Sequence, residues 1–275
     1  MRKNKLLSKL FLYIVLLFMY IPILVLIVFS FNESKSRANF TGFSLKWYSK
    51  LLHNETILTS LLNTILIALA AAVLATILGT AAAIGINNMK KVSKTAIMNI
   101  TYIPVVNPEI IMGVSLMLLF KGMSNIIGFQ FGFITLILSH IAFDVPYVIY
   151  NVLPKLRQMN PNLIEAARDL GCNERQAFFK VAVPEIMPGV FSGFLMSITY
   201  SIDDFVISYF TSGASVETLP ITIYSMTRRK VSPEINAVST IIFLVIIAIL
   251  IIKNYLENRS LRKAREESVA VKNYG

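Results

Sequence analysis

A chain of 275 residues that is 55% hydrophobic and only 15% charged is not an ordinary soluble protein, because soluble domains carry about 25% charged residues. The net charge of +11 does not indicate nucleic-acid binding, because the basic residues are segregated between alternate loops. Eighteen of the 26 Lys and Arg residues lie at the two ends of the chain and in loops 87–95 and 153–184, and eight lie in the other loops. This asymmetry is typical of a membrane protein whose basic loops lie in the cytoplasm.

We predict an all-α polytopic membrane protein with about six transmembrane helices and both termini in the cytoplasm. A helix needs about 20 apolar residues to cross about 30 Å of hydrocarbon, and six runs of the sequence meet this requirement. The expected parts are a cytoplasmic N-terminus (1–9), a first transmembrane helix (10–30), an extracytoplasmic loop (31–56), a transmembrane domain (57–253) and a cytoplasmic tail (254–275). The transmembrane domain is expected to hold spans at about 57–86, 97–120, 131–152, 185–210 and 235–253, with a cytoplasmic loop at 153–184.

The first apolar run follows the basic start MRKNKLLSKL, which is also how a signal peptide begins. Its apolar part continues for about 20 residues, whereas the apolar region of a signal peptide has about 7–15. The run ends in FSFNES, which contains no cleavage site of the small-x-small type. We therefore expect this run to be a retained transmembrane helix.

The third and fourth predicted spans carry carboxylates close to prolines. The third contains YIPVVNPEI, in which Glu109 follows the second proline. In the fourth, the 4-3-4 spacing of His140, Asp144, Tyr147 and Asn151 puts four polar residues on one helix face. Acids inside membrane spans are rare and functional by default. Glu109 and Asp144 are therefore candidates for a transport path, and the alternative is that Asp144 pairs with His140 and only joins helices.

The cytoplasmic loop 153–184 is expected to begin with a short helix. Asn160 followed by Pro161 is a typical helix start, and the sequence LIEAARDL consists largely of good helix formers. Gly171 stands where a left-handed residue ends a helix. Three interpretations stay open on these residues alone: a solvated connector, a helix that enters a groove on a partner, and a DNA-binding helix–turn–helix, which the flanking spans disfavour.

A second helix is expected after the first one in the same loop. Asn173 is a plausible N-cap, and Gln176 three residues later completes a capping box. This helix is expected to run to Pro184, which can open the fifth membrane span. The loop therefore predicts two consecutive helices rather than an irregular connection.

The same loop resembles the EAA motif of ABC importer permeases, EAA-x3-G-x9-I-x-LP. The match consists of Glu165, Ala166, Ala167, Gly171 and Pro184, with Val181 and Val183 in place of the aliphatic pair. In that family the segment is a coupling helix that docks into a cleft on the ATP-hydrolysing subunit. The resemblance therefore implies a type I ABC importer permease fold, with Glu165, Ala166, Ala167 and Gly171 as the docking element.

Further segments are similar to the permease subunits of spermidine/putrescine importers of the PotC type. They are KWYSKLL (46–52), SIDDFVISYFTSG (201–213) and LPITIYSMTRRKVSPEINAVSTI (219–241). This resemblance implies a permease in a bacterial inner membrane that works with a homologous second permease, an ATPase dimer and an extracytoplasmic polyamine-binding protein. ATP and Mg would be bound by the partner ATPase. The alternatives are an ABC permease for another cationic or neutral solute and an ATP-independent channel or carrier, which needs no docking element for an ATPase.

The sequence contains no nucleotide or catalytic motif of its own. No G-x-x-x-x-G-K-[ST] phosphate loop occurs, and neither HExxH nor GxSxG is present. The glycines of LGTAAAIG lie inside a predicted span, where small residues permit close helix packing. Because the chain has only His53 and His140, we expect no multi-histidine metal site. The missing motifs and the resemblance to permeases lead us to expect no cofactor bound by the chain and no enzymatic activity. An intramembrane enzyme remains as an alternative that rests only on the buried acids.

Two adjacent aspartates, Asp203 and Asp204, stand out in the fifth predicted span. In a continuous helix, Ser197, Ser201, Asp204 and Ser208 share one face, and Asp203 lies about 100° away around the axis. One arrangement therefore puts Asp204 in the path and Asp203 against a neighbouring helix, and the reverse arrangement stays open. Carboxylates and tyrosine rings suit a cationic cargo, whereas acids that pair with His, Tyr or backbone groups only hold helices together. The candidate path residues are Asp203, Asp204, Ser201, Tyr200, Glu109, Asp144 and Tyr147.

Overall fold

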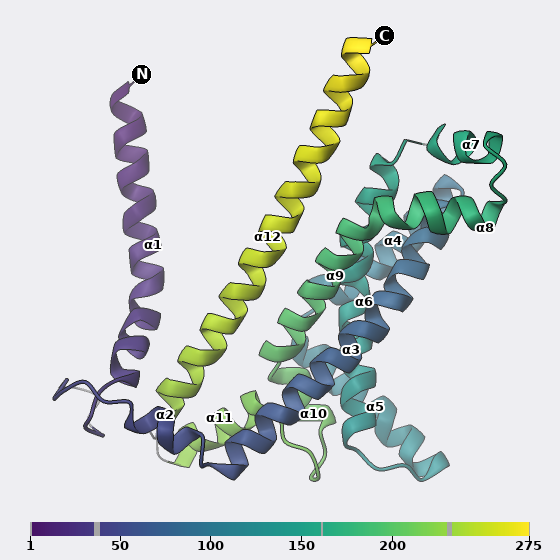
Figure 1. Ribbon diagram of the computed structural model, residues 1–275. Coiled ribbons are helices and arrows are strands. Elements are labelled where there is room, and N and C mark those ends of the chain that lie inside the picture. Colours follow the sequence, from purple (N-terminus) through teal and green to yellow (C-terminus); the bar gives the residue numbers. More distant parts are fainter. Residues whose placement is uncertain (1, 36–38, 161, 230–232, 275) are drawn as a thin grey trace. The chain divides into compact units, whose positions relative to one another are not determined.

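The computed structural model describes residues 2–35, 39–160, 162–229 and 233–274, and most of these residues are helical (Figure 1). The helices are α1 (Arg2–Ser30), α2 (Lys46–Leu51), α3 (Glu55–Asn87), α4 (Lys91–Val106), α5 (Glu109–Ile127), α6 (Phe133–Gln158), α7 (Asn162–Asp169), α8 (Glu174–Ala177), the π-helix η1 (Phe178–Ala182), α9 (Val183–Asp203), α10 (Val206–Thr211), α11 (Leu219–Arg229) and α12 (Glu234–Tyr274). Within the described ranges there is no strand, and one isolated bridge joins Asn32 to Phe43.

Within the described residues, six helices are long and apolar enough to cross a membrane, which confirms the predicted all-α polytopic fold. They cover Leu7–Ser30, Glu55–Asn87, Glu109–Ile126, Phe133–Gln158, Glu174–Asp203 and Glu234–Tyr255. These helices have about the length that a helix needs to cross about 30 Å of hydrocarbon.

The third membrane helix differs from the single span expected at 97–120. The chain forms two helices there, α4 and α5, and Asn107 between them is extended, with φ −76° and ψ 137°. Pro108 explains the break, because a proline ring disfavours the α conformation of the residue before it. Glu109 consequently lies in the first turn of α5 rather than in the middle of a span.

The fifth membrane helix also differs from expectation, because it is not continuous to residue 210. Helix α9 ends at Asp203, and Asp204 is extended with φ −65° and ψ 119° before α10 begins at Val206. The helical spacing that placed Asp204 on one face with Ser197 and Ser201 therefore does not extend past Asp203. The positions of the two aspartates have to be taken from the contacts that they make.

The chain forms two compact units, of which the first comprises residues 1–59 and 222–246. In this unit the segment expected as the first extracytoplasmic loop is folded around Trp47, which is 1% exposed. The Trp47 indole N–H donates to the backbone carbonyl of Asn32 at 2.6 Å. The buried carboxylate of Glu234 pairs with Lys50 and accepts from the side-chain amide of Asn54. These contacts fix α2 against the start of α12.

The second unit comprises residues 60–221 and 247–275, and its centre is the packing of α3, α6 and α9, which lie side by side (Figure 1). Val148 of α6 is fully buried at this centre. Gly79 of α3 and Gly193 of α9 both face Val148, and a Cβ at Gly79 would lie 2.6 Å from the Val148 Cβ. Small residues let membrane helices approach closely. The expectation that the LGTAAAIG glycines serve packing is therefore confirmed for Gly79.

Two alanine substitutions on α3 test this close approach with a matched control. A methyl group at Gly79 overlaps Val148, whereas at Gly85 no atom lies within 4 Å of the added Cβ. Overpacking typically costs about 1–3 kcal/mol, so Gly79→Ala should lower the thermal unfolding temperature of the purified protein. Gly85→Ala should leave it unchanged or raise it, since Ala favours helix over Gly by about 1 kcal/mol. Equal unfolding temperatures for the two variants would contradict the α3–α6 contact.

Candidate functional site

The break between α9 and α10 is organised by the carboxylate of Asp204. Its Oδ2 accepts hydrogen bonds from the backbone N–H and the hydroxyl of Ser208, each at 2.7 Å, and its Oδ1 accepts from the backbone N–H of Ile207 at 3.1 Å. The residue is 8% exposed. Asp204 therefore caps the first turn of α10, where backbone N–H groups have no partner within the helix. This competition for backbone donors explains why α9 stops at Asp203.

His140 of α6 joins this capped turn to α9. Its Nδ1 lies 2.5 Å from the Ser201 hydroxyl, and its Nε2 lies 3.0 Å from the Ser208 hydroxyl and 3.5 Å from Asp204 Oδ2. The imidazole is 2% exposed. It therefore connects α6, α9 and α10 in the interior of the second unit, a role that helical spacing within one span does not predict.

Asp144, one turn after His140 on α6, is 0% exposed. Its Oδ2 lies 3.4 Å from the Ser201 hydroxyl, and no hydrogen-bond partner for its Oδ1 occurs in the described part of the chain. The expected alternative, a pair between Asp144 and His140, takes an indirect form, because Ser201 stands between the two side chains. Asp144 is therefore an interior residue and does not face an open path.

Asp203 and Glu109 lie on the accessible side of the same region. Both residues are exposed, and neither side chain takes part in a hydrogen bond or ion pair with the described residues. Helix α5 packs against α10, and Gly113, one turn after Glu109, approaches Ile207. Glu109 lies within electrostatic range of both aspartates. The accessible side therefore combines two carboxylates that are available to a ligand.

A tyrosine pair stands between α6 and α9 in the same unit. The ring centroids of Tyr147 and Tyr200 are 4.4 Å apart, and Phe143 lies 5.3 Å from the first ring and 6.1 Å from the second. Both tyrosines are half-buried, whereas Phe143 is buried. Aromatic faces attract ammonium and guanidinium groups, so exposed acids and half-exposed tyrosines suit a cation.

The structure thus divides the predicted path residues into two groups. The accessible group is Asp203, Glu109, Tyr147 and Tyr200, and the interior group is Asp204, Asp144 and Ser201. Asp203 is exposed and Asp204 is buried, and which of the two faces a transport path stays a prediction. The arrangement with Asp204 in the path assumed a helix that continues beyond Asp203, and Asp204 itself interrupts that helix.

The loop 153–184 has the local structure that its sequence predicts. Helix α7 ends at Asp169, and Gly171 two residues later has a left-handed φ of 89°. Its N–H donates to the carbonyl of Arg168 at 2.8 Å, and the N–H of Cys172 donates to the carbonyl of Ala167 at 3.0 Å, which is the Schellman pattern. The capping box of α8 is formed by Asn173 and Gln176. At the start of α7, Asn160 accepts from the N–H of Asn162 at 3.1 Å, and Pro161 lies outside the described residues.

The predicted docking residues do not all face outward. Glu165, Ala166 and Gly171 are exposed, but Ala167 is only 8% exposed because it packs inward. The sequence pattern did not single out Leu170 and Phe179, which are 87% and 66% exposed. The feature that could have identified them is that both are apolar residues in an otherwise charged loop. These side chains and Glu165 give the loop an exposed surface that is partly apolar and partly acidic.

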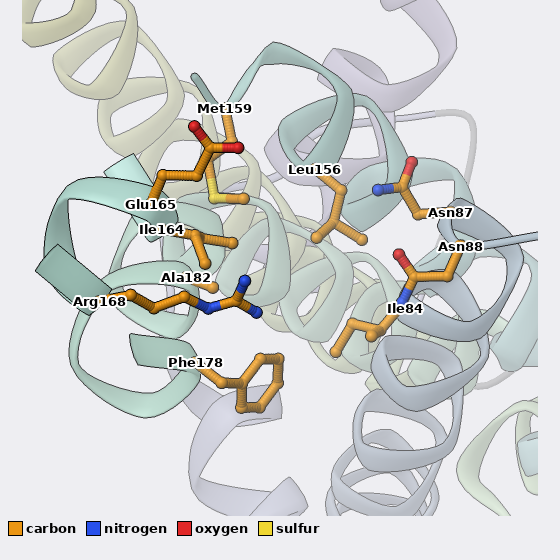
Figure 2. Close-up of a pocket in the computed structure, with 10 residues that line it drawn as sticks. All are labelled: Ile84, Asn87, Asn88, Leu156, Met159, Ile164, Glu165, Arg168, Phe178 and Ala182. Atoms are coloured by element: carbon orange, nitrogen blue, oxygen red, sulfur yellow. The ribbon is translucent and has the colours of Figure 1, made fainter. Parts of the chain in front are cut away.

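A pocket of about 330 Å³ lies behind the loop, between α7, η1 and the ends of α3 and α6 (Figure 2). Figure 2 shows Arg168 extending from α7 into this space, with Asn87 and Asn88 on the other side. The lining residues are Ile84, Asn87, Asn88, Leu156, Met159, Ile164, Glu165, Arg168, Phe178 and Ala182. The pocket therefore lies between the loop and the ends of α3 and α6.

Comparison with known proteins identifies the family. The family described as "Binding-protein-dependent transport system inner membrane component" matches residues 75–263. The chain belongs to this family. The permease is 35% identical over 254 residues to the spermidine/putrescine transport system permease protein PotC of Haemophilus influenzae, covering 92% of this chain and 97% of the relative. It is 36% identical over 219 residues to the putrescine transport system permease protein PotI of Escherichia coli K12, covering 78% of each chain.

Solved structures support the fold of the permease. A chain of a bacterial ABC transporter that imports the acidic polysaccharide alginate has a TM-score of 0.69, with 16% identity and coverage of 95% of this chain and 96% of that one. A chain of an amino acid ABC transporter has a TM-score of 0.55, with 19% identity and coverage of 79% and 100%. The permease is therefore a multi-pass protein of a bacterial inner membrane, and its family implies an ATPase and a binding protein as partners.

The matched variants Asp204→Asn and Asp203→Asn test the assignment of one aspartate to the interior. Hydrogen bonds to charged groups contribute about 1.5–3 kcal/mol, and Asp204 accepts three of them. Asp204→Asn should therefore lower the thermal stability of the purified permease by about 2 kcal/mol, because an amide replaces a charged acceptor. Asp203→Asn should stay within about 0.5 kcal/mol of wild type, as is usual for surface positions. A larger loss from Asp203→Asn than from Asp204→Asn would refute the assignment.

Proposed function

We propose that the permease is a membrane subunit of an ATP-driven importer of polyamines, spermidine or putrescine. The observation that carries this proposal is the combination of exposed Asp203 and Glu109 with the Tyr147–Tyr200 pair in one unit. The names of relatives at 35–36% identity support the same cargo. Polyamines are flexible chains with protonated amines at their ends, so a path for them needs separated anionic contacts and apolar or aromatic surface between them.

The chemistry of recognition follows from the exposed groups. A carboxylate forms charge-assisted hydrogen bonds with an ammonium group and so replaces part of its hydration. Asp203 and Glu109 serve this purpose, and the faces of Tyr147 and Tyr200 attract the same cation. Ser201, Asp144 and Asp204 act as positioning residues that fix the helix ends carrying the exposed groups. A path of this charge disfavours inorganic anions and acidic solutes.

The partners follow from the family and from the cytoplasmic loop. A homologous second permease would complete the path, and an extracytoplasmic binding protein would deliver the cargo. An ATPase pair, which would bind ATP and Mg, would dock on α7 at Glu165, Ala166 and Gly171, with Leu170 as an added apolar contact. The termini and this loop would then lie in the cytoplasm. The chain contributes two discrete arrangements that ATP and cargo favour differently.

Transport by variants of the exposed acids tests the polyamine path. Uptake of radiolabelled spermidine and putrescine into proteoliposomes holding the complete importer and ATP should fall about 10- to 100-fold in kcat/KM for Asp203→Asn and for Glu109→Gln. The factor corresponds to one lost charged hydrogen bond, at about 1.4 kcal/mol per tenfold. Glu55→Gln changes an exposed acid in the first turn of α3 and should leave uptake unchanged. Normal uptake by both path variants would exclude the proposed contacts, and ATP-driven uptake of another solute without polyamine uptake would favour the alternative cargo.

A substitution in the loop tests the coupling to the ATPase. Gly171→Asp puts a side chain at a φ of 89°, which non-glycine residues adopt only with strain, and adds a charge to the proposed docking surface. We expect membrane insertion to be retained while ATP hydrolysis no longer drives polyamine uptake. The measurement is the ratio of transported polyamine to hydrolysed ATP in proteoliposomes. An unchanged ratio would count against the docking role, as would failure of an ATPase to copurify with the wild-type permease when the two are coexpressed.

A further inference from the structure

We propose that Asp144, Ser201 and His140 form a buried proton-binding site that holds one proton, which resides on Asp144. The three side chains come from α6 and α9, and each residue is at most 3% exposed. The inference concerns the charge of the interior and does not depend on the identity of the cargo. It follows from counting hydrogen-bond donors along the chain of contacts from Asp204 to Asp144.

At the Asp204 end of this series of contacts, the orientation of the Ser208 hydroxyl proton is fixed. Asp204 accepts from two backbone N–H groups and from the Ser208 hydroxyl, so its oxygens act as acceptors in all three contacts. A serine hydroxyl has one proton to donate, and Ser208 uses it on Asp204. The 3.0 Å contact between Ser208 and His140 Nε2 therefore requires that Nε2 carries a proton and donates it.

At the Asp144 end of this series of contacts, one hydroxyl proton is available for two acceptors. His140 Nδ1 and Asp144 Oδ2 both contact the Ser201 hydroxyl, at 2.5 Å and 3.4 Å. If Asp144 were ionised and His140 neutral, Ser201 would satisfy one acceptor and leave the other facing its lone pairs. Both contacts are satisfied only when the cluster contains one additional proton, either as a carboxylic acid on Asp144 or as an imidazolium on His140.

Burial places this proton on Asp144. In this arrangement the Ser201 hydroxyl, which lies 2.5 Å from His140 Nδ1 and 3.4 Å from Asp144 Oδ2, donates to the imidazole and accepts from the protonated acid. Asp144 Oδ1 has no hydrogen-bond partner among the described residues, and an ionised carboxylate is strongly disfavoured in such a position. Proton transfer from Asp144 to His140 would move the Asp144 proton to Ser201 Oγ while the Ser201 proton moves to His140 Nδ1, and the total charge of the three residues would not change.

The surroundings define what this site does for the permease. The titratable groups around His140 are Asp144 on α6, Asp204 between α9 and α10 and, further away, Glu109, Asp203, Tyr147 and Tyr200. Of the two interior acids, Asp204 accepts three hydrogen bonds at the start of α10, whereas Asp144 contacts only the Ser201 hydroxyl. The accessible charge therefore comes from Asp203 and Glu109. Asp144 is a positioning residue that acts as an uncharged hydrogen-bond donor between α6 and α9.

Infrared spectroscopy of the full chain in lipid nanodiscs tests the proton directly. The wild-type spectrum at neutral pH should contain a carboxylic-acid C=O band that shifts in D₂O and is absent from Asp144→Asn. The matched variant Asp204→Asn should retain this band and lose intensity only from the carboxylate region. A wild-type minus Asp144→Asn difference spectrum with a carboxylate band and no carboxylic-acid band would overturn the proposal.

A second variant keeps the test decisive if Asp144→Asn does not fold. Ser201→Ala removes the hydroxyl that lies 3.4 Å from Asp144 Oδ2 and that, in the proposed arrangement, accepts from the protonated acid, so the carboxylic-acid band should move to higher wavenumber as its O–H becomes free. The tautomer of His140 provides an independent readout, because ¹⁵N spectra of labelled histidine should show a neutral ring protonated at Nε2. An unshifted band in Ser201→Ala, or an imidazolium signal from His140 in wild type, would contradict the assignment.

Discussion

The capping of α10 by the buried carboxylate of Asp204 determines the structure around it. Because this side chain accepts from the backbone N–H groups of Ile207 and Ser208, α9 ends at Asp203, immediately before Asp204, and the chain turns there. His140 can then reach Ser201 and Ser208 at once, which ties α6 to both helices. In a membrane interior no water is present to satisfy such groups, so each polar contact depends on the others.

The two adjacent aspartates consequently have different roles. The turn directs Asp204 inward and leaves Asp203 exposed, so one acid holds the helices and the other is available to a cation. Glu109 obtains a similar position through another break, because Pro108 ends α4 and starts α5. Interruptions in membrane helices thus present the exposed charges, while the α3–α6–α9 core around Val148 stays closely packed. The same core ends at the loop that contains α7, where the pocket beside α7 adjoins α3 and α6.

Features that depend on local sequence could be predicted, and features that depend on distant contacts could not. Apolar length gave the six membrane helices, and Gly171, Asn173 and Gln176 gave the helix ends in the loop, because these signals act within a few residues. The break at Asp204 depends on burial and on His140, which lies 64 positions earlier in the chain. Helical periodicity assumes that the helix continues, so it placed Asp204 and Ser208 on one face with Ser201. The inward position of Ala167 likewise depends on packing behind α7.

Accessibility of single cysteines tests the separation of interior and exposed residues most directly. In a chain with Cys172→Ser, Asp203→Cys and the nearly isosteric Ser201→Cys would be treated with a water-soluble cationic thiol reagent in proteoliposomes of the complete importer, with and without spermidine. The account predicts rapid labelling of the cysteine at position 203, slowed by spermidine, and almost no labelling at position 201, which is 3% exposed in the wild-type chain. Rapid, spermidine-sensitive labelling at position 201 would contradict it.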